Sequence, residues 1–257
     1  MGGLLHNLRH PRRCYAVCTI PRSGSNLLTD GLRATSRAGV PKQFFLPKFE
    51  ARYGAQHRLD PAADYAGYVR GIVDAKTTSN EVFGFKLMSW YLDDFLARLR
   101  ETRAFRDMGT GDLDLLQNIF PRLRFVHIFR SHKLRQALST ARALQTGLWK
   151  VQKGKAIQRE PQFDAELIQQ CLKEGQRQEE AWECFFQRIG VNPFRVEYEK
   201  LCQDYEGTIR AVLDFLRISL PRRARIGPPM TVRQSDEISR AWEERFLAER
   251  SGAPAQI

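Results

Sequence analysis

Residues 15–28 read Tyr15-Ala-Val-Cys-Thr-Ile-Pro-Arg-Ser-Gly-Ser-Asn-Leu-Leu28, and this stretch decides the fold. Its first six residues are apolar or β-branched, as in a strand buried within a parallel sheet. Pro21 cannot continue such a strand because it has no N–H to give to the ladder. Beyond the polar turn, Leu27 and Leu28 begin the apolar face of a helix. The stretch therefore predicts a strand, a tight loop and a helix in succession.

The loop has the chemistry of an anion site. Gly24 allows a ligand to approach the backbone closely, and Ser25 is a suitable residue for the start of a helix. The N–H groups at that helix start, the helix dipole and the guanidinium of Arg22 would converge on one point. Because a guanidinium binds planar or tetrahedral oxyanions through paired N–H groups, a phosphate or sulfate group is the expected guest.

Other loops of this kind fit less well. A Walker A loop requires G-x-x-x-x-G-K-[ST], and no lysine follows Gly24. A tyrosine-phosphatase loop is excluded because Cys18 lies only four residues before Arg22. The loop instead resembles the 5′-phosphosulfate loop of sulfotransferases that use 3′-phosphoadenosine 5′-phosphosulfate (PAPS), above all the bacterial trehalose 2-sulfotransferase and nodulation-factor families. On that resemblance the donor-binding residues of the loop are Arg22, Ser23, Gly24, Ser25 and Asn26.

The composition fits one large domain that binds anions. The chain has 257 residues, 42% of them hydrophobic, and 41 Lys and Arg against 29 Asp and Glu give a net charge of +12. This charge would attract nucleic acid, an anionic membrane or a charged nucleotide. The arginines form only short clusters, at 9–13 and 222–225, so nucleic acid is not the expected partner. We expect a flexible N-terminal arm at 1–13 and a single domain at 14–257.

Cysteine usage and hydropathy bear on the compartment. The five cysteines are odd in number and lack the pairing of a metal site, and Cys14 and Cys18 fall in the first strand as small core residues. No apolar run approaches the length of a membrane span, and the N-terminus lacks the apolar region of a signal peptide. These features predict a soluble, cytoplasmic protein without a transmembrane segment.

Three further strands are expected at 81–88, 124–129 and 194–198, with helical periodicity between them. This alternation predicts an α/β protein with a P-loop-like three-layer fold, in which helices flank a mainly parallel sheet. Residues 46–61 are predicted to form a surface loop that shapes an acceptor pocket, and 150–161 a second, polar loop.

A second anion site is expected after the third strand. Arg130 directly follows the strand, and Gln136-Ala-Leu-Ser139 lies in the next helix. This order resembles the Arg and Ser pair that binds the 3′-phosphate in sulfotransferases, so Arg130 and Ser139 are assigned to the donor. Taken alone, the pair would be a solvated arginine and an ordinary helix serine.

The resemblance extends from Tyr15 to about Arg245. Gly84-Phe-Lys-Leu-Met resembles a strand of the trehalose-type enzymes, and Arg142-Ala-Leu-Gln-Thr-Gly-Leu-Trp149 a segment shared by both bacterial groups. Arg233 begins a stretch similar to a C-terminal Arg-Gln motif and is assigned to the donor. The resemblance also implies a homodimer.

One position departs from the pattern. Where the trehalose-type enzymes carry a Glu that is the proposed base, this chain has Gln43 in Lys-Gln-Phe-Phe. An amide cannot take a proton, so Gln43 would only orient the acceptor. Glu50, His57 and His127 are candidate substitute bases. His127 in an apolar strand is more typical of a core residue, and His57 falls in the expected loop.

The resemblance implies an in-line displacement at sulfur, with 3′,5′-adenosine bisphosphate (PAP) as the product. Arg22 and Lys86 would stabilise the charge on the leaving oxygen, without a metal ion. A strand-end lysine with its ammonium in solvent is the other interpretation of Lys86. Arg142, Gln145 and Trp149 are assigned to the acceptor, although Trp149 also suits a core position.

The sequence therefore predicts a PAPS-dependent sulfotransferase that acts on a hydroxyl of a carbohydrate, glycolipid or small metabolite. A nucleotide-dependent phosphotransferase fits the fold but lacks the Walker lysine. A basic nucleic-acid or surface-binding module explains the charge but not the two anion motifs. Gln43 keeps open a nucleotide-binding relative without catalysis.

Overall fold

The computed structural model describes residues 11–149, 160–221, 224–227 and 237–251. In this part of the chain the sheet has four strands, and all pairs are parallel. The strands are β1 (Arg13–Thr19), β2 (Val82–Met88), β3 (Arg124–Phe129) and β4 (Phe194–Glu197), in the spatial order β2-β1-β3-β4.

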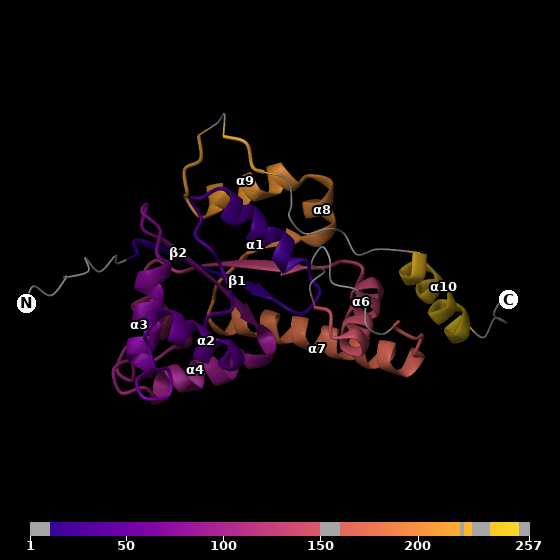
Figure 1. The fold of residues 1–257 in the computed structure, drawn as a ribbon, viewed down its shortest axis with the longest axis horizontal. Coiled ribbons are helices and arrows are strands. Elements are labelled where there is room, and N and C mark those ends of the chain that lie inside the picture. The colour runs from indigo at the N-terminus through magenta and orange to yellow at the C-terminus, as the bar shows by residue number, and fades with distance from the viewer. Residues whose placement is uncertain (1–10, 150–159, 222–223, 228–236, 252–257) are drawn as a thin grey trace, which may run out of the picture.

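Helices cover both faces of this sheet (Figure 1). One face carries α1 (Ser25–Ala34), α8 (Tyr198–Gln203) and α9 (Tyr205–Phe215). The other carries α2 (Pro47–His57), α3 (Tyr65–Lys76), the 3₁₀ helix Ser89–Tyr91, α4 (Leu92–Glu101), α5 (Asp112–Ile119) and α7 (Ala165–Arg188). Each face has its own buried core, so the predicted three-layer α/β fold is confirmed.

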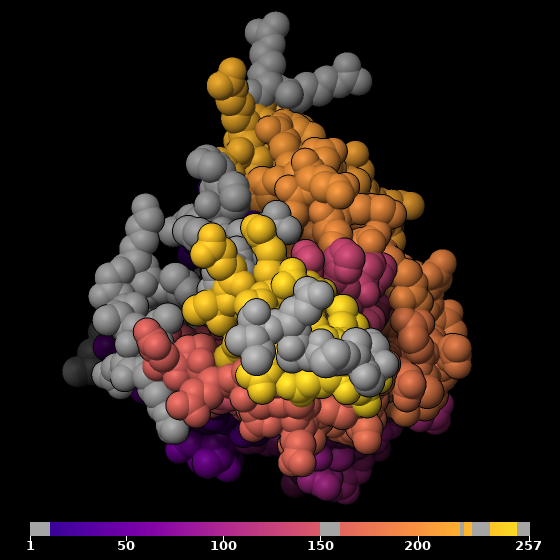
Figure 2. Space-filling model, turned by 90° about the vertical axis from the view of Figure 1, so that its right-hand side faces the viewer, coloured from indigo at the N-terminus to yellow at the C-terminus, as the bar shows by residue number. Residues whose placement is uncertain are grey.

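A third cluster lies at the carboxyl end of the strands. There α6 (Lys133–Thr146) packs between α7 and α10 (Glu237–Ser251), and Figure 2 shows α10 lying over α6 and the start of α7. Trp242 and Phe246 of α10 are buried against α6 residues such as Leu138. The last helix is thereby fixed beside the segment that carries Ser139.

The strand order creates a switch point in the sheet. The chain leaves β1 toward β2 on one side and leaves β3 toward β4 on the other, although β1 and β3 are neighbours. In open α/β sheets, ligands bind at such a switch point, outside the carboxyl ends of the strands. The loop after β1 and Arg130 after β3 both lie at this place.

Two local predictions differ from the structure, and one helix was missed. Residues 46–61 do not form a loop, because α2 begins at Pro47, which suits a first helical turn, and buries Glu50 and Tyr53. The expected arm at 1–13 extends too far, since the backbone N–H groups of Arg12 and Arg13 both donate to the Glu81 carbonyl. The short helix α8 was not predicted, because six residues carry too little periodicity.

Candidate active site

The turn between β1 and α1 has the backbone of an anion-binding loop. Arg22 (φ 59°) and Gly24 (φ 89°) are both in the left-handed region. The N-cap residue of α1 is Gly24, which has no side chain with which to cap the first-turn N–H groups. A Cβ on Gly24 would lie 2.1 Å from Cδ2 of Tyr198, so only glycine fits against this ring. The helix start therefore has the geometry that favours an anion.

Arg22 links this loop to distant parts of the chain. Its Nε donates to Ser139 Oγ at 2.8 Å, and its Nη1 donates to the Trp149 carbonyl at 2.7 Å. Burial lowers the pKa of Arg22, and the positive charge of Arg130 lowers it further. A bound anion would offset both effects, since it would balance two neighbouring cations in a partly desolvated site.

Arg130 occupies the second expected anion site. Its guanidinium carbon lies 4.9 Å from the centre of the Tyr198 ring, and its Nε is 3.5 Å from Glu199 Oε1. This Nε is buried and makes no hydrogen bond, and burial lowers the pKa of the side chain. Arg130 also lines a cavity of about 240 Å³ with His132, Arg135, Tyr198, Glu199, Cys202 and Gln203. The two arginines of this cavity offer N–H donors to a phosphate group, beside the carboxylate of Glu199.

Ser139 lies near Arg130 but is not bonded to it. Its hydroxyl accepts the hydrogen bond from Arg22, so Ser139 joins the loop rather than pairing directly with Arg130. The Tyr198 ring connects the two sites, since it lies against Gly24 of the loop and 4.9 Å from the guanidinium carbon of Arg130. The structure therefore brings Arg22, Arg130 and Ser139 together at the switch point of the sheet.

Lys86 lies beside the first turn of α1. It is 7% exposed, and its Nζ donates to Asn26 Oδ1 at 3.0 Å. Its backbone N–H donates to the Lys42 carbonyl at 2.9 Å, which places the half-buried Gln43 next to the same strand. The side chain of Lys86 thus contacts Asn26, and its backbone contacts the segment that contains Gln43.

Two of the three candidate substitute bases contact charged side chains. Glu50 is buried and accepts a hydrogen bond from Arg98 at 2.6 Å. His57 is the last residue of α2 rather than part of a loop, and burial and Lys76 lower its pKa. His127 is 1% exposed within β3. Its ring lies 3.4 Å from Glu179, 3.8 Å from Glu183 and 3.3 Å from Arg195. Glu50 is therefore held in an ion pair with Arg98, and His127 is enclosed in the strand beside charged side chains.

The expected acceptor residues lie at the end of α6. The Trp149 carbonyl accepts from Arg22, and the Trp149 side chain is 44% exposed. Arg142 is close enough to lower the pKa of Arg22, and its Nη1 donates to Ser239 of α10 at 2.7 Å. Gln145 makes two hydrogen bonds with the backbone of Gln162. Arg233 lies outside the described residues.

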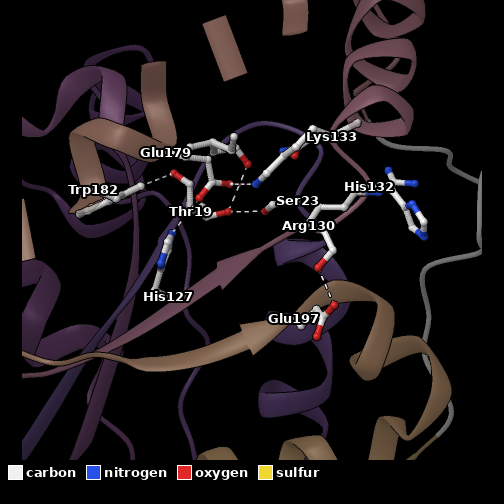
Figure 3. Close-up of polar contacts among 12 residues, drawn as sticks. Thr19, Ser23, His127, Arg130, His132, Lys133, Glu179, Trp182 and Glu197 are labelled. Atoms are coloured by element: carbon white, nitrogen blue, oxygen red, sulfur yellow. Dashed lines mark hydrogen bonds and ion pairs between the residues drawn. The ribbon is translucent and has the colours of Figure 1, made fainter. Parts of the chain in front are cut away.

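Several residues that shape the loop were not predicted from the sequence. The indole N–H of Trp182 donates to the Thr19 carbonyl at 2.9 Å, and the Thr19 and Ser23 hydroxyls are 2.5 Å apart (Figure 3). Gln136 donates to the Pro21 carbonyl at 2.8 Å. Ser23 itself is fully buried, so its hydroxyl supports the loop from inside. Gln136 begins the Gln136-Ala-Leu-Ser139 motif, whereas no motif in the sequence around Trp182 indicated a role.

Among the residues that the structure describes, no three His, Cys, Asp or Glu side chains gather as metal ligands. Within the same residues, no helix combines the length and apolar character needed to cross a membrane.

Comparisons with known proteins place this arrangement in a family. Residues 14–249 match the sequence profile of Stf0 sulphotransferases. The trehalose 2-sulfotransferase of Mycolicibacterium smegmatis is 29% identical over 275 residues, which cover 95% of this chain and 98% of that protein. That of Mycobacterium tuberculosis is 28% identical, with 94% and 98% covered.

Solved structures that resemble the chain are more distant in sequence. A sulfotransferase from Alicyclobacillus acidocaldarius has a TM-score of 0.48 at 13% identity, over 93% of this chain and 92% of that one. Retinol dehydratase in a complex with retinol and PAP has a TM-score of 0.43 at 12% identity, over 95% and 81%.

Proposed function

This chain belongs to the Stf0 sulphotransferase family, and we propose that it transfers a sulfonyl group from PAPS to a hydroxyl of a carbohydrate, glycolipid or similar small metabolite. The observation that carries the proposal is the meeting of Arg22, Ser139 and Arg130 at the start of α1. A nucleotide with phosphate groups at both its 5′ and 3′ positions needs two such cationic sites a short distance apart.

The two sites divide the donor between them. Arg22 and the backbone of residues 23–26 bind the 5′-phosphosulfate, because the helix start and its dipole favour an anion there. Arg130 binds the 3′-phosphate, supported by its unbonded, buried Nε and by the adjoining cavity. Arg233, outside the described residues, is assigned to the donor on resemblance alone.

Transfer is an in-line displacement. The acceptor oxygen forms a bond to sulfur, the bond from sulfur to the bridging phosphate oxygen breaks, and that electron pair leaves with PAP. Lys86 and Arg22 stabilise the charge that develops on the bridging oxygen. The contact of Lys86 with Asn26 supports this role, since it holds the ammonium at the helix start.

The acceptor's proton must leave with a group other than Gln43. We propose that the proton passes to water, because Glu50 is held by Arg98, His127 is enclosed within β3, and burial and Lys76 lower the pKa of His57. A hydroxyl that ionises more readily than a sugar alcohol would then react faster. Gln43 orients that hydroxyl beside Lys86, and Trp149 offers its exposed ring to the acceptor.

Calorimetric titration with PAP tests the donor site without knowledge of the acceptor. We expect PAP to bind more tightly than ADP or 5′-AMP. Arg130→Ala should weaken PAP binding by about tenfold to a hundredfold, since it removes a charge-assisted hydrogen bond. Arg177→Ala removes an equal charge from an ion pair with Glu174 on the surface of α7 and should leave the affinity unchanged. Equal binding of PAP and ADP, or tighter binding of ADP, would remove the proposal.

The homodimer and the cytoplasmic location are also proposals. Exposed Leu144 of α6, with Ile238 and Leu247 of the neighbouring α10, supports an association surface at this end of the molecule. Sedimentation equilibrium should give twice the mass of the chain, and a monomer at micromolar concentration would contradict the dimer.

A further inference from the structure

Two buried side chains donate hydrogen bonds to backbone carbonyl groups, one at the end of β1 and one in the loop that follows. Gln136 of α6 donates to the Pro21 carbonyl at 2.8 Å, and Trp182 of α7 donates to the Thr19 carbonyl at 2.9 Å. Both side chains are buried, and they come from positions 115 and 163 residues further along the chain. Neither lies where a ligand would contact it, so their effect on a ligand would pass through the loop backbone.

The hydrogen bond from Gln136 to the Pro21 carbonyl also determines the direction of the next N–H group. In a planar trans peptide unit, the carbonyl and the following N–H point to opposite sides. Because the Pro21 carbonyl is held toward Gln136, the N–H of Arg22 must point away from α6. If that peptide unit rotated, the loop would present a carbonyl dipole of the wrong sign to an anion.

The loop needs such support because its backbone is strained. Arg22 has a φ of 59°, a left-handed conformation that a residue other than glycine adopts only when its surroundings require it. The Thr19 hydroxyl lies 3.1 Å from the Ile20 carbonyl, and it shares a hydrogen bond of 2.5 Å with the Ser23 hydroxyl. Trp182 fixes the Thr19 carbonyl at the base of this contact.

We propose that Gln136 and Trp182 are positioning residues that aim the loop N–H groups at the 5′-phosphosulfate of the donor. The inference rests on the proposed function, because it assumes that the loop binds this group. It goes beyond that function by assigning the orientation of the loop to two side chains that touch neither donor nor acceptor.

The main test replaces the Gln136 donor in two ways. Gln136→Met removes the hydrogen bond and should weaken PAP binding about tenfold through the misaligned N–H. Gln136→Glu adds a group that repels the Pro21 carbonyl when ionised and donates to it when protonated. The Kd of Gln136→Glu, divided by that of the wild type at each pH, should therefore fall as the pH is lowered from 8 to 5. Dividing by the wild-type Kd cancels the titration of the ligand itself.

Gln178 provides a matched control. It is a buried glutamine of α7, and its Nε2 donates to Glu174 at 2.6 Å rather than to the loop. The same two substitutions at Gln178 should leave PAP affinity unchanged at every pH. If Gln136→Met binds PAP like the wild type, or if the ratio for Gln136→Glu does not depend on pH, the inference is wrong.

A second arm tests Trp182. Trp182→Phe keeps a buried ring but loses the indole N–H, and it should weaken PAP binding as Gln136→Met does. Phe185→Leu is its control, because Phe185 packs edge-on against Trp182 at 5.8 Å and makes no side-chain hydrogen bond to the loop. Phe185→Leu should lower the Tm but not the PAP affinity. Equal loss of affinity in both variants would indicate a general packing role and overturn the assignment of Trp182.

Inorganic pyrophosphate separates this inference from the proposed function. It has no adenosine and no 3′-phosphate, so its binding reports on the loop alone. If the wild type binds pyrophosphate but does not prefer PAP to ADP, the donor assignment fails and Gln136→Met must still weaken pyrophosphate binding. If the wild type binds neither PAP nor pyrophosphate, both proposals are overturned.

Discussion

Gln43 directly follows Lys42, whose carbonyl accepts the backbone N–H of Lys86 at 2.9 Å. At this position the resemblance to trehalose-type enzymes places a carboxylate base, and this chain has an amide of almost the same shape. An amide can orient a hydroxyl group but cannot accept its proton. Replacing Gln43 by Glu therefore tests whether a base at this position adds to the orientation of the acceptor.

We expect Gln43→Glu to raise turnover with an alcohol acceptor. Trehalose, the sugar in the names of the two relatives, is a suitable probe. A positioned base contributes about a hundredfold or more, so kcat should rise by roughly that factor. The gain should vanish as the pH falls through the pKa of the new carboxyl group, because only the ionised form is a base. Initial rates of PAP release between pH 4 and 8 measure this.

The control at this position is Gln43→Met, which keeps the length of the side chain without polar atoms. It should lower the activity of the wild type if Gln43 orients the acceptor. If Gln43→Glu shows no gain at any pH, the proton leaves by a route that does not pass residue 43, and the proposed geometry of transfer is wrong.

At the scale of elements, the loop between β1 and α1 is supported by three helices. The ring of Tyr198 in α8 lies against Gly24, while α6 and α7 contribute Gln136 and Trp182. Gly24 combines a positive φ with a close neighbour, so it is the position at which an added methyl group should do most harm.

Gly24→Ala should abolish PAP binding and lower the free energy of unfolding. The added Cβ would lie 2.1 Å from the Tyr198 ring, so the ring or the loop must move. Gly190→Ala is the matched control, since its φ is 63° and nothing lies within 4 Å of an added Cβ. That substitution should cost only about 1 kcal/mol for the left-handed backbone and leave PAP affinity intact. Calorimetry and urea unfolding measure both effects, and equal behaviour of the two variants would contradict the role of Tyr198.

The sequence predicted those elements whose signal is local. Apolar runs identified the four strands, and the positions of Arg22 in the turn after β1 and of Arg130 directly after β3 followed from those runs. The contacts of Gln136 and Trp182 with the loop could not be predicted, because they join positions more than 100 residues apart and depend on how α6 and α7 pack. The helix α2 was missed for a different reason: Pro47 and Gly54 are typical of loops, but tertiary packing makes them tolerable in a helix.

At the scale of the whole molecule, the candidate site lies at the carboxyl ends of the two central strands, β1 and β3. The chain's net charge of +12 attracts anions in general. Arg22 and Arg130 add a local attraction at the switch point, where their partial burial strengthens the interaction of each charge with an anion. Three cysteines of this fold are buried and two are exposed. The reactivity of the exposed thiols can therefore show which part of the surface a ligand covers.

Alkylation of the native protein should distinguish two groups of cysteines. Cys14, Cys18 and Cys171 are buried, and burial raises the pKa of Cys14 to about 12 and also raises the pKa values of the other two. Since the thiolate is the reactive form, these three should resist iodoacetamide at pH 8. Cys184 and Cys202 are exposed and should be modified, as peptide mass spectrometry after timed quenching would show.

PAP should protect only one of the two exposed thiols. Cys202 lines the cavity that contains Arg130, so a 3′-phosphate bound there would cover it, whereas Cys184 lies on α7 outside that cavity. The modification rate of Cys202 should therefore fall in proportion to PAP occupancy while that of Cys184 stays constant, and 5′-AMP should protect neither. Arg130→Ala should remove the protection together with PAP affinity. If saturating PAP leaves the rate at Cys202 unchanged, the 3′-phosphate lies elsewhere, and the cavity beside Arg130 is not part of the donor site.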